Sequence, residues 1–315
     1  MAEIVLTGGA GFIGSNLLRA LPATSVAVFD NFSRGNRDSL PEHVAVFEGD
    51  IRDPVALGSA LRGARAVVHL AAYGSVVESV GDPTANFDIN AFGTQCVLEA
   101  CRLQKVERVV FASTGGALIG DAIPPVDEGS LPRPISPYGA SKLCGEAYCH
   151  AYAKSYGLRT VALRFANIYG PFSAHKKGAI TRFMKALMRG EPITIYGEGT
   201  ATRDYLHVDD LCRGISKALS QDIAPGEVFH IASGVETSVS ALAALVSEVA
   251  GQPGHPIIRL PSRPGEVGRN FARFDKAAAT LGFEPRVSLR EGLASTWAWF
   301  CENRDAVLSS TESDN

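Results

Sequence analysis

The residues best suited to chemistry are a tyrosine and a lysine four positions apart. Tyr138 and Lys142 stand in "SPYGASK" at 136–142, at the start of a stretch with helical spacing. Residues four apart lie on one face of a helix, so the ammonium would lie beside the phenol. A phenol has a pKa of about 10 and is a poor base at neutral pH, but a nearby positive charge favours its phenolate. The pair could therefore remove the proton of a hydroxyl group.

This spacing also arises by chance, as an aromatic core residue beside a solvated lysine, so its surroundings decide its meaning. The strand expected at 107–113, "ERVVFAS", leads into Thr114, and a glycine-rich turn opens the chain. Together these features favour a site in which a base removes the proton of a hydroxyl group while a hydride leaves the carbon that bears that hydroxyl.

The elements that would position such a site begin with "IVLTGGAGFIGSNLL" at 4–18. An export signal is one interpretation, but Glu3 precedes the run and glycines interrupt the apolar core that a signal peptide requires. The other interpretation is a strand, a tight turn and a helix. That order places a pyrophosphate on the free N–H groups at the helix N-terminus.

Asp30 ends the second expected strand, sixteen residues after Gly14. A carboxylate there can accept both ribose hydroxyls of an adenosine and would repel the extra phosphate of NADP, so NAD is favoured. The alternative is that Asp30 only begins the turn "DNFSRGN".

Short apolar strands alternate with helical stretches along the first half of the chain, at 25–30, 44–49, 65–72, 107–113 and 159–165. This alternation predicts an α/β fold with a Rossmann-type, doubly wound parallel sheet, which binds ligands at the carboxyl ends of its strands. The pattern loosens after Gly170. We expect an NAD-binding domain over 1–170, segments around 202–233 that cross back to it, a smaller C-terminal substrate-binding lobe over 171–304, and a frayed tail over 305–315.

The composition excludes several other classes of protein. The chain of 315 residues has 30 Lys and Arg against 33 Asp and Glu, which leaves no basic excess for nucleic acid. No apolar run approaches the length of a membrane span. Its six cysteines lack the close pairs of a zinc or redox site, so we expect reduced thiols and no metal. These features predict a soluble, cytoplasmic protein.

Further motifs follow one another along nearly the whole chain: "TGGAGFIGSNL", "VFDNFSRG", "GDIRD", "VVHLAA", "NAFGT", "ASTGG", "SPYGASK", "LRFANIYGP", "GEGTATRDYLHVDDL" and "RPGEV". With them the chain resembles the extended short-chain dehydrogenases/reductases, in the NAD-dependent nucleotide-sugar epimerase and dehydratase group, and within it proteins like UDP-glucose 4-epimerase. The resemblance implies bound NAD, a UDP-sugar substrate and an isomerase.

The resemblance also assigns roles to matching positions. The glycines at 8, 11 and 14 would hold the pyrophosphate, Asp50 with Ile51 the adenine, and Lys142 the nicotinamide ribose. The positions expected to bind NAD are Gly8, Gly11, Phe12, Ile13, Asp30, Asn31, Ser33, Gly35, Asp50, Ile51, Leu70, Ala71, Ala72, Asn90 and Lys142.

On the substrate side, Tyr138, Lys142 and Thr114 are the expected catalytic residues, with Thr114 bonded to the reacting hydroxyl. Asn167 matches a residue that contacts the diphosphate or the sugar. Arg203 and Arg263 match two arginines that hold the diphosphate, for which guanidinium groups are well shaped. Without the family context, each arginine would read equally well as half of a surface ion pair.

The residues after Thr114 separate the branches of the family. Dehydratases and decarboxylases resemble one another in carrying acidic residues there, whereas this chain has Gly115 and Gly116. Without a carboxylate to move the second proton, epimerisation at carbon 4 fits best. Ile119 replaces the tyrosine usual before Gly120, which puts a substrate contact in doubt. The alternatives are a dehydratase, decarboxylase or ketoreductase of the same fold, or a non-catalytic NAD-binding protein.

Two further expectations concern the sugar and the assembly. Asn270, seven residues after Arg263, stands where a tyrosine excludes N-acetylated sugars in the related epimerases, and Arg269 beside it could attract a carboxylate. Both would then bind substrate, unless Arg269 faces solvent and Asn270 only shapes its loop. The helical stretches "TQCVLEACRLQ" and "LCGEAYCHAYAKSYG" are apolar on more than one side. They predict a homodimer, unless both sides are buried against the sheet.

Overall fold

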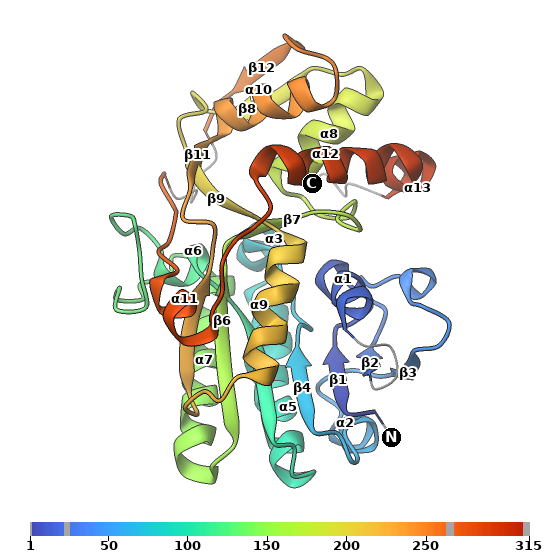
Figure 1. Ribbon diagram of the computed structural model, residues 1–315, viewed down its shortest axis with the longest axis vertical. Coiled ribbons are helices and arrows are strands. Elements are labelled where there is room, and N and C mark those ends of the chain that lie inside the picture. Colours follow the sequence, from blue (N-terminus) through green and yellow to red (C-terminus); the bar gives the residue numbers. More distant parts are fainter. Residues whose placement is uncertain (1, 22–25, 263–267, 311–315) are drawn as a thin grey trace.

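The computed structural model describes residues 2–21, 26–262 and 268–310. Among these residues, seven strands form one parallel sheet in the order β10-β6-β5-β4-β1-β2-β3 (Figure 1). Their bounds are β1 Ile4–Thr7, β2 Val26–Asp30, β3 Ala45–Glu48, β4 Ala66–His69, β5 Arg108–Thr114, β6 Arg159–Phe165 and β10 Glu227–Ile231. The strand order reverses at β1, between β2 and β4, and such a point leaves a crevice at the carboxyl ends of the strands. The predicted Rossmann-type sheet is confirmed.

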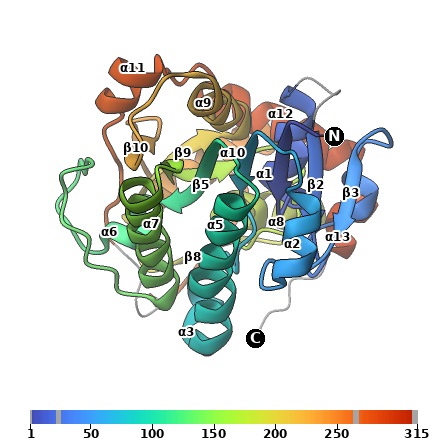
Figure 2. The same ribbon diagram turned by 90° about the horizontal axis from the view of Figure 1, so that it is seen from below.

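Helices cover both faces of the sheet, which is why its central strands are apolar along their whole length (Figure 2). Leu6 of β1 packs in one core and its neighbour Val5 in the other, because successive side chains point to opposite faces. The layers are built by α1 (Phe12–Ala20) and α9 (Val208–Ser220) on one face, and by α2 (Pro54–Ala60), α5 (Gly93–Leu103) and α7 (Pro137–Tyr156) on the other.

A smaller lobe stands over the carboxyl ends of the strands (Figure 1). Its helices and strands enclose a separate apolar core around Phe183, Leu242 and Phe300. The elements of this lobe are α8 (Ala179–Arg189), β8 (Ile193–Tyr196), α10 (Val239–Val249), β12 (Ile257–Leu260), α12 (Leu289–Glu302) and α13 (Arg304–Ser309). A small sheet of β11 (Glu236–Ser238), β9 (Thr202–His207) and β7 (Asn167–Tyr169) lies between the lobe and the large sheet.

The chain crosses between the two halves more than once. After β9 it returns to the large sheet through α9 and β10, within the segment 202–233. It returns again at α11 (Asp275–Leu281), where Ala277 and Leu281 pack into the core beneath α1 and α9. Part of the segment expected in the lobe therefore lies in the Rossmann half.

The structure is ordered over part of the tail that was expected to be frayed, as far as Ser309. Residues Arg304–Ser309 form α13, and Val307 is fully buried in the core of the lobe. The ammonium of Lys185 donates to the carbonyl oxygen of Ser310 at 3.0 Å, which holds the end of this helix. Val307 and the distant Lys185 hold this helix, and the polar sequence around Val307 gives no sign of either contact.

Several short elements surround the crevice: η1 (Arg37–Ser39), α3 (Val76–Gly81), α4 (Pro83–Asn86), the π-helical turn η2 (Phe87–Phe92) and α6 (Gly116–Ile119). The run from α3 to η2 packs along α7 and connects β4 to α5. It therefore supports the helix that carries Tyr138 and Lys142.

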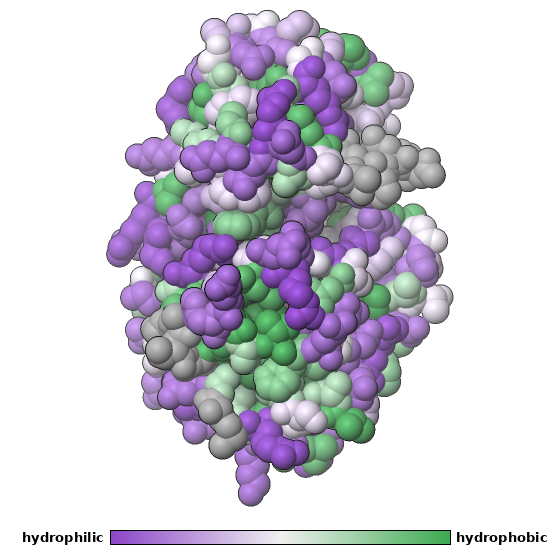
Figure 3. Space-filling view, turned by 90° about the vertical axis from the view of Figure 1, so that its right-hand side faces the viewer, coloured by the Kyte–Doolittle hydropathy of each residue, from purple (hydrophilic) through white to green (hydrophobic). Residues whose placement is uncertain are grey.

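The surface differs between the two halves. Figure 3 shows the side that lies at the right in Figure 1, where hydrophobic residues gather on the Rossmann half and hydrophilic residues cover much of the lobe. Within the described ranges, no helix is both long and apolar enough to cross a membrane. In the same ranges, no three His, Cys, Asp or Glu side chains cluster in a way that could hold a metal ion. All six cysteines are free thiols, of which Cys101, Cys149 and Cys212 are buried.

Candidate active site

One cavity of about 770 Å³ runs along the crevice between the sheet and the lobe. It reaches from the glycine-rich turn after β1, past the ends of β4 and β5, to the strands β7 and β9. Of the residues expected to bind NAD or substrate, the cavity brings together Gly8, Gly11, Phe12, Ile13, Asp30, Asn31, Ser33, Gly35, Asp50, Ile51, Leu70, Ala71, Ala72, Thr114, Tyr138, Lys142, Asn167, Arg203 and Asn270.

The turn after β1 is built so that a ligand can approach its backbone. Gly8 has a φ of +70°, and a Cβ there would stand 2.5 Å from the backbone nitrogen of Ala71. A Cβ at Gly14 would stand 2.5 Å from the Cα of Gly9, so the first turn of α1 lies directly against the loop. Glycine is therefore required at both positions, and the start of α1, which lines the cavity, is where the sequence predicts a pyrophosphate.

Asp30 serves the turn and lines the cavity. Its Oδ2 accepts from the N–H of Ala10 at 2.9 Å, and its Oδ1 accepts from the N–H of Phe32 at 2.9 Å. Each carboxylate oxygen can accept more than one hydrogen bond, so both remain able to receive a ribose hydroxyl. The turn and the ribose interpretations of Asp30 are thus compatible.

At the end of the cavity where adenine is expected, Asp50 already has a strong partner. Arg52 donates to its two oxygens at 2.8 and 2.7 Å, and Asn31 donates at 3.3 Å. The hydrogen bonds of Arg52 lower the pKa of the Asp50 carboxyl to about 2. The side chain of Asp50 is therefore largely committed to Arg52, while buried Ile51 beside it lines the cavity.

Asn90 was expected at the cofactor, but it is not among the residues that line the cavity. Its Oδ1 accepts from the N–H of Tyr73 at 2.7 Å, and its Nδ2 donates to Ser141 Oγ at 3.0 Å. It is 1% exposed and joins η2 to α7 and to the loop after β4. We correct its role to a positioning residue for that loop, because both ends of its amide are used inside the protein.

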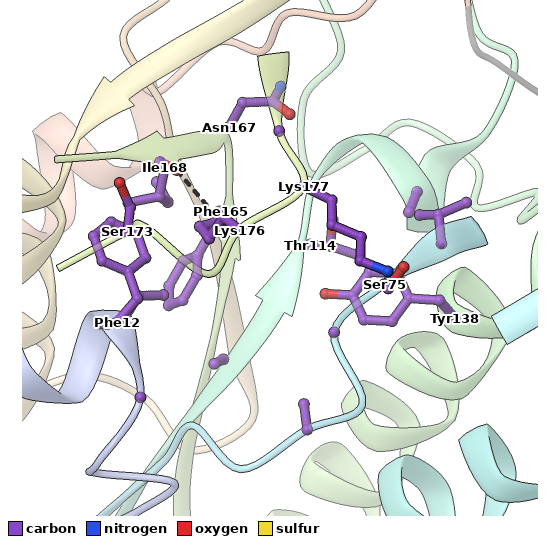
Figure 4. Close-up of a pocket in the computed structure, with 18 of the residues that line it drawn as sticks. Phe12, Ser75, Thr114, Tyr138, Phe165, Asn167, Ile168, Ser173, Lys176 and Lys177 are labelled. Carbon is purple, nitrogen blue, oxygen red and sulfur yellow. Dashed lines mark hydrogen bonds between the residues drawn. The ribbon is translucent and has the colours of Figure 1, made fainter. Parts of the chain in front are cut away.

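Tyr138 and Lys142 project from the first turns of α7. Ser136 caps this helix, since its hydroxyl accepts from the N–H of Gly139, and Pro137 follows at a position that suits proline. The ammonium of Lys142 donates to the carbonyl oxygen of Ala112 at 2.8 Å, which ties α7 to β5. Figure 4 shows Tyr138 and Thr114 together on one side of the cavity.

Burial acts on both groups. It raises the pKa of the Tyr138 phenol to about 12 and lowers the pKa of the Lys142 ammonium to about 8. The expectation that the phenolate is favoured rests on the ammonium together with the positive charge of bound NAD. In the protein alone, loss of water around the phenol is the cause of the rise. A further positive charge is needed beside Tyr138 before it can act as a base at neutral pH.

A buried ion pair beneath Thr114 fixes the strand ends. Arg164 of β6 donates to Glu146 of α7 at 2.8 Å, and the hydroxyl of Ser113 donates to the same carboxylate at 2.6 Å. Arg164 and Glu146 are almost fully buried, so breaking the pair would leave an uncompensated charge. The network holds α7 in register with β5 and therefore sets Tyr138 against Thr114.

The substrate side of the cavity comes from β7, β9 and the loop after the undescribed residues 263–267. Asn167 donates to the carbonyl oxygen of Asp204 at 3.2 Å, and Arg203 donates to that of Thr202 at 2.8 Å. Asn270 lies against Gly116, where a Cβ would stand 2.9 Å from its Cγ. Arg263, the second arginine expected at the diphosphate, lies outside the described residues.

Arg269 does not lie where the sequence predicts. It forms hydrogen bonds of 2.7 and 2.8 Å with both oxygens of Glu236, its side chain is 57% exposed, and it is not among the cavity-lining residues. The expectation that it binds substrate is corrected, since successive residues of an extended segment point in opposite directions.

The loop between β7 and α8 adds cations that sequence reasoning missed. Lys176 donates to the carbonyl oxygen of Ile168 at 3.0 Å and lies 5.0 Å from the ring centre of Phe12, opposite Tyr138 (Figure 4). Burial lowers the pKa of its ammonium to about 8. Lys177 pairs with Glu78 at 3.0 Å. In the sequence, the adjacent Lys176 and Lys177 were the only indication of these cavity cations, and adjacent lysines in a short loop are usually solvated.

Comparisons with known proteins agree with this arrangement. The model of the NAD dependent epimerase/dehydratase family matches residues 4–232. A putative UDP-glucose 4-epimerase of Methanocaldococcus jannaschii is 35% identical over 306 residues, covering 95% of this chain and 99% of that protein. A dTDP-glucose 4,6-dehydratase of Streptomyces niveus is also 35% identical, over 316 residues that cover 96% of this chain and 94% of that protein.

Among solved structures, the UDP-glucose 4-epimerase of Thermotoga maritima with UDP-glucose superimposes with a TM-score of 0.91. It is 36% identical, and the match covers 96% of this chain and 99% of that one. Sheet order, cavity and motifs therefore have one explanation: the chain belongs to the NAD-dependent epimerase/dehydratase family.

Proposed function

We propose that the protein epimerises carbon 4 of a UDP-sugar through a 4-keto intermediate, with bound NAD. The observation that carries this proposal is that Tyr138 and Thr114 share a cavity with the dinucleotide turn, while the described part of that cavity offers no uncommitted carboxylate. Removal and return of hydride at one carbon needs no second acid–base pair.

The acidic side chains that line the described cavity all have partners inside the protein. Asp30 accepts from Ala10 and Phe32, Asp50 from Arg52, Glu78 from Arg34 and Lys177, and Asp204 from Ser233 and Gly234. The positions after Thr114 are Gly115 and Gly116. Elimination of water or loss of a carboxyl group would require a proton carrier that these residues do not supply.

The residues present fit NAD, as the tight Gly8 turn, the N-terminus of α1 and the buried carboxylate of Asp30 indicate. When bound, NAD supplies the acceptor and donor of hydride and a positive charge near the phenol. Tyr138 would take the proton of the carbon-4 hydroxyl, with Lys142 favouring its phenolate and Thr114 holding the hydroxyl oxygen.

The second half of the reaction depends on a fixed diphosphate. Arg203 and Asn167 would hold it, so that the keto sugar can turn about its anomeric linkage and present its opposite face. Tyr138 then returns the proton to the oxygen on carbon 4. Affinity that comes from the nucleotide leaves the sugar free to turn.

A panel of nucleotide-sugars tests this proposal. The purified protein is incubated with UDP-glucose, UDP-galactose, UDP-N-acetylglucosamine, UDP-glucuronate and dTDP-glucose, and the products are identified by NMR. We expect interconversion at carbon 4 of at least one UDP-sugar. A 4-keto-6-deoxy product or the loss of carbon dioxide would instead assign a dehydratase or decarboxylase.

The sugar range is a finer proposal that rests on Asn270. We propose that the pocket admits an N-acetylhexosamine as well as glucose and galactose, because Asn270 lines the cavity where a tyrosine would take more room. Arg269 gives no support to a uronate, since Glu236 binds it. Rates on UDP-galactose and UDP-N-acetylgalactosamine for the natural protein and for Asn270→Tyr test the point. Equal exclusion of the acetylated sugar by both would contradict it.

We also propose a homodimer through α5 and α7, which lie side by side on the outer face of the sheet (Figure 2). Large apolar or aromatic side chains of this layer are exposed, among them Leu103 at 61%, Tyr156 at 58% and Phe92 at 48%. Association of two such surfaces would remove them from water.

A further inference from the structure

Lys176, in the loop between β7 and α8, is a cation of the cavity that the proposed reaction does not use. Its side chain is partly exposed and lines the cavity, and its ammonium donates to the carbonyl oxygen of Ile168 at 3.0 Å. An ammonium has three N–H groups to donate. Among the described residues, no carboxylate pairs with this ammonium, whereas the neighbouring Lys177 pairs with Glu78.

The missing counter-charge has an energetic consequence. Burial lowers the pKa of the Lys176 ammonium to about 8, and no carboxylate nearby raises it again. A buried charge without a partner is costly, and a ligand that carries the opposite charge offsets that cost. The part of the cavity around Lys176 therefore suits an anion better than a neutral group.

Phe12 relates this ammonium to the first turn of α1. The ammonium lies 5.0 Å from the centre of the Phe12 ring, and Phe12 is the first residue of α1, where a pyrophosphate is expected. Figure 4 shows Phe12 and Lys176 on one side of the cavity, with Tyr138 and Thr114 on the other. Lys176 thus belongs to the part of the crevice beside the dinucleotide turn.

Hydrogen bonds hold the loop that carries Lys176 against α1. Asn16 of α1 donates to the carbonyl oxygen of Pro171 at 2.9 Å. Within the loop, the hydroxyl of Ser173 donates to the carbonyl oxygen of Gly170 at 2.6 Å, and the N–H of Lys176 donates to that of Ser173 at 2.9 Å. The protein itself therefore sets the position of Lys176 relative to α1.

Two bound molecules could supply the anion, because NAD and a UDP-sugar each contain a diphosphate. The ring contact at Phe12 and the anchor at Pro171 both involve α1, the helix of the dinucleotide turn. The substrate diphosphate is expected at Arg203 and Asn167, on β9 and β7. Ile168 of β7 also holds the ammonium, so the affinity for both ligands has to be measured. The contacts with α1 favour NAD.

We infer that Lys176 binds the pyrophosphate of NAD and supplies a counter-charge to it from outside the glycine-rich turn. Dinucleotide turns bind this group through N–H groups and the helix dipole, which carry only partial charges. A full positive charge from the loop before α8 strengthens that binding and joins the cofactor to a segment that leads into the lobe. This role concerns the cofactor, so it is the same for whichever nucleotide-sugar reaction the protein catalyses.

The release of NAD from the purified holoprotein tests this role. Displacement by a fluorescent dinucleotide analogue gives the rate for the natural protein, Lys176→Met and Lys176→Arg. Lys176→Met keeps the length of the side chain without its charge, and it should release NAD about 10-fold faster or more, the scale of a charge-assisted hydrogen bond. Lys176→Arg keeps the charge, so its rate should lie closer to the natural one.

Competing ligands locate the contact on the cofactor. ADP-ribose keeps the pyrophosphate and adenosine lacks it, and the same displacement gives the inhibition constant of each. Lys176→Met should weaken ADP-ribose by about the same factor as NAD and leave adenosine within about 2-fold. Equal weakening of both would mean that the variant changes the shape of the site, and it would overturn the inference.

Ser173→Ala is the matched control for the loop. It removes the hydrogen bond to Gly170 and leaves the ammonium in place, so it should release NAD more slowly than Lys176→Met. The same acceleration in both variants would show that the conformation of the loop, and not its charge, retains NAD. Unfolding temperatures report whether each variant is folded.

Calorimetry with UDP measures the second diphosphate. Weaker binding of UDP by Lys176→Met, with unchanged release of NAD, would assign the ammonium to the substrate and overturn the inference. A natural protein that binds no NAD would refute it outright. A protein that holds NAD through Lys176 and converts no UDP-sugar would refute only the proposed function.

Discussion

Tyr138 illustrates how two effects on a single residue oppose each other. Its burial raises the pKa of the phenol to about 12, whereas proton removal from a sugar requires the phenolate. Burial also lowers the pKa of the Lys142 ammonium to about 8, so this group is still mainly charged at neutral pH. The phenolate is therefore scarcely populated at neutral pH in the protein alone, and we expect the positive charge of bound NAD to favour it. Coupling of base strength to cofactor binding follows from this arrangement.

The first prediction is that Tyr138→Phe abolishes turnover and retains NAD. The change removes the hydroxyl that accepts the proton and keeps the ring that lines the cavity. Thr114→Val should slow turnover by about 10²-fold or more, the scale of a positioned acid–base group. Turnover is measured by NMR and bound nucleotide by chromatography after extraction. Full activity in Tyr138→Phe would contradict the mechanism.

At the scale of elements, we propose that the turn between β1 and α1 carries the cofactor. Three segments meet there: the turn itself, the loop after β4 and the first turn of α1. Gly8 touches the backbone of Ala71, so the phosphate turn and the end of β4 are packed without any side chain between them. A methyl group at this point would separate two segments that both line the cavity.

We therefore predict that Gly8→Ala purifies without the NAD that the natural protein carries. Alanine would suffer both the positive φ and a contact of 2.5 Å with a backbone nitrogen. Gly157→Ala is the matched control, because Gly157 has a φ of +71° at the end of α7 but no atom within 4 Å of its Cβ. Both variants pay the conformational cost of about 1–2 kcal/mol, and only Gly8→Ala should lose the nucleotide. Loss of NAD from both would assign the effect to strain alone.

The elements that sequence predicts well are those with a strong local pattern. The strands of the large sheet are continuous apolar runs, and the glycine turn needs its residue type for steric reasons. The return of α11 to the Rossmann half and the packing of α13 depend on single side chains such as Leu281 and Val307, which no periodicity marks. The position of such segments is determined by tertiary contacts, which local sequence does not show.

The same limit applies to the site. Tyr138, Lys142 and Asp30 could be placed at the cavity from the sequence, because Tyr138 and Lys142 have the spacing of one helix face and Asp30 ends a strand. Sequence cannot tell that Glu236 binds Arg269, or that Asn90 uses its amide inside the protein, since both facts depend on partners far along the chain. Arg263 matches the family pattern and stays a prediction.

At the scale of the whole molecule, buried histidines link folding to pH. Burial lowers the pKa of His69 to about 3 and that of His230 to about 4. In the unfolded chain each has its ordinary pKa of about 6.5. Between these values the unfolded chain binds protons that the folded protein excludes, so stability rises with pH in this window and falls as pH is lowered through it.

We predict that the free energy of unfolding decreases from about pH 6.5 toward pH 4, by up to about 1.4 kcal/mol per pH unit for each of the two histidines. Urea unfolding at several pH values measures the slope, and His230→Asn should make it shallower. The same slope in the variant would show that His230 does not contribute.

Assembly is the remaining prediction at this scale. We expect light scattering at micromolar concentration to give twice the 33.3 kDa mass of the chain. Leu103→Glu with Tyr148→Glu should yield monomers, because both side chains are exposed on the α5–α7 layer and a charge there opposes its burial. A control change on the opposite layer, Lys217→Glu in α9, should leave the mass unchanged. A monomer mass for the natural protein would refute the dimer.

Glu78 holds two cations that come from different halves of the molecule. Its carboxylate pairs with Arg34 from the loop after β2 at 2.5 Å and with Lys177 from the loop before α8 at 3.0 Å, and all three residues line the cavity. These pairs are partly exposed, so dissolved ions screen them. We predict a kinetic consequence. Exchange of bound dinucleotide with the solvent should be slow in dilute buffer and should accelerate between about 0.1 M and about 1 M salt, and Glu78→Gln should abolish this dependence on ionic strength. Displacement by a fluorescent dinucleotide analogue follows the rate, and one that is equally fast at both salt concentrations would show that Glu78 does not retain the cofactor.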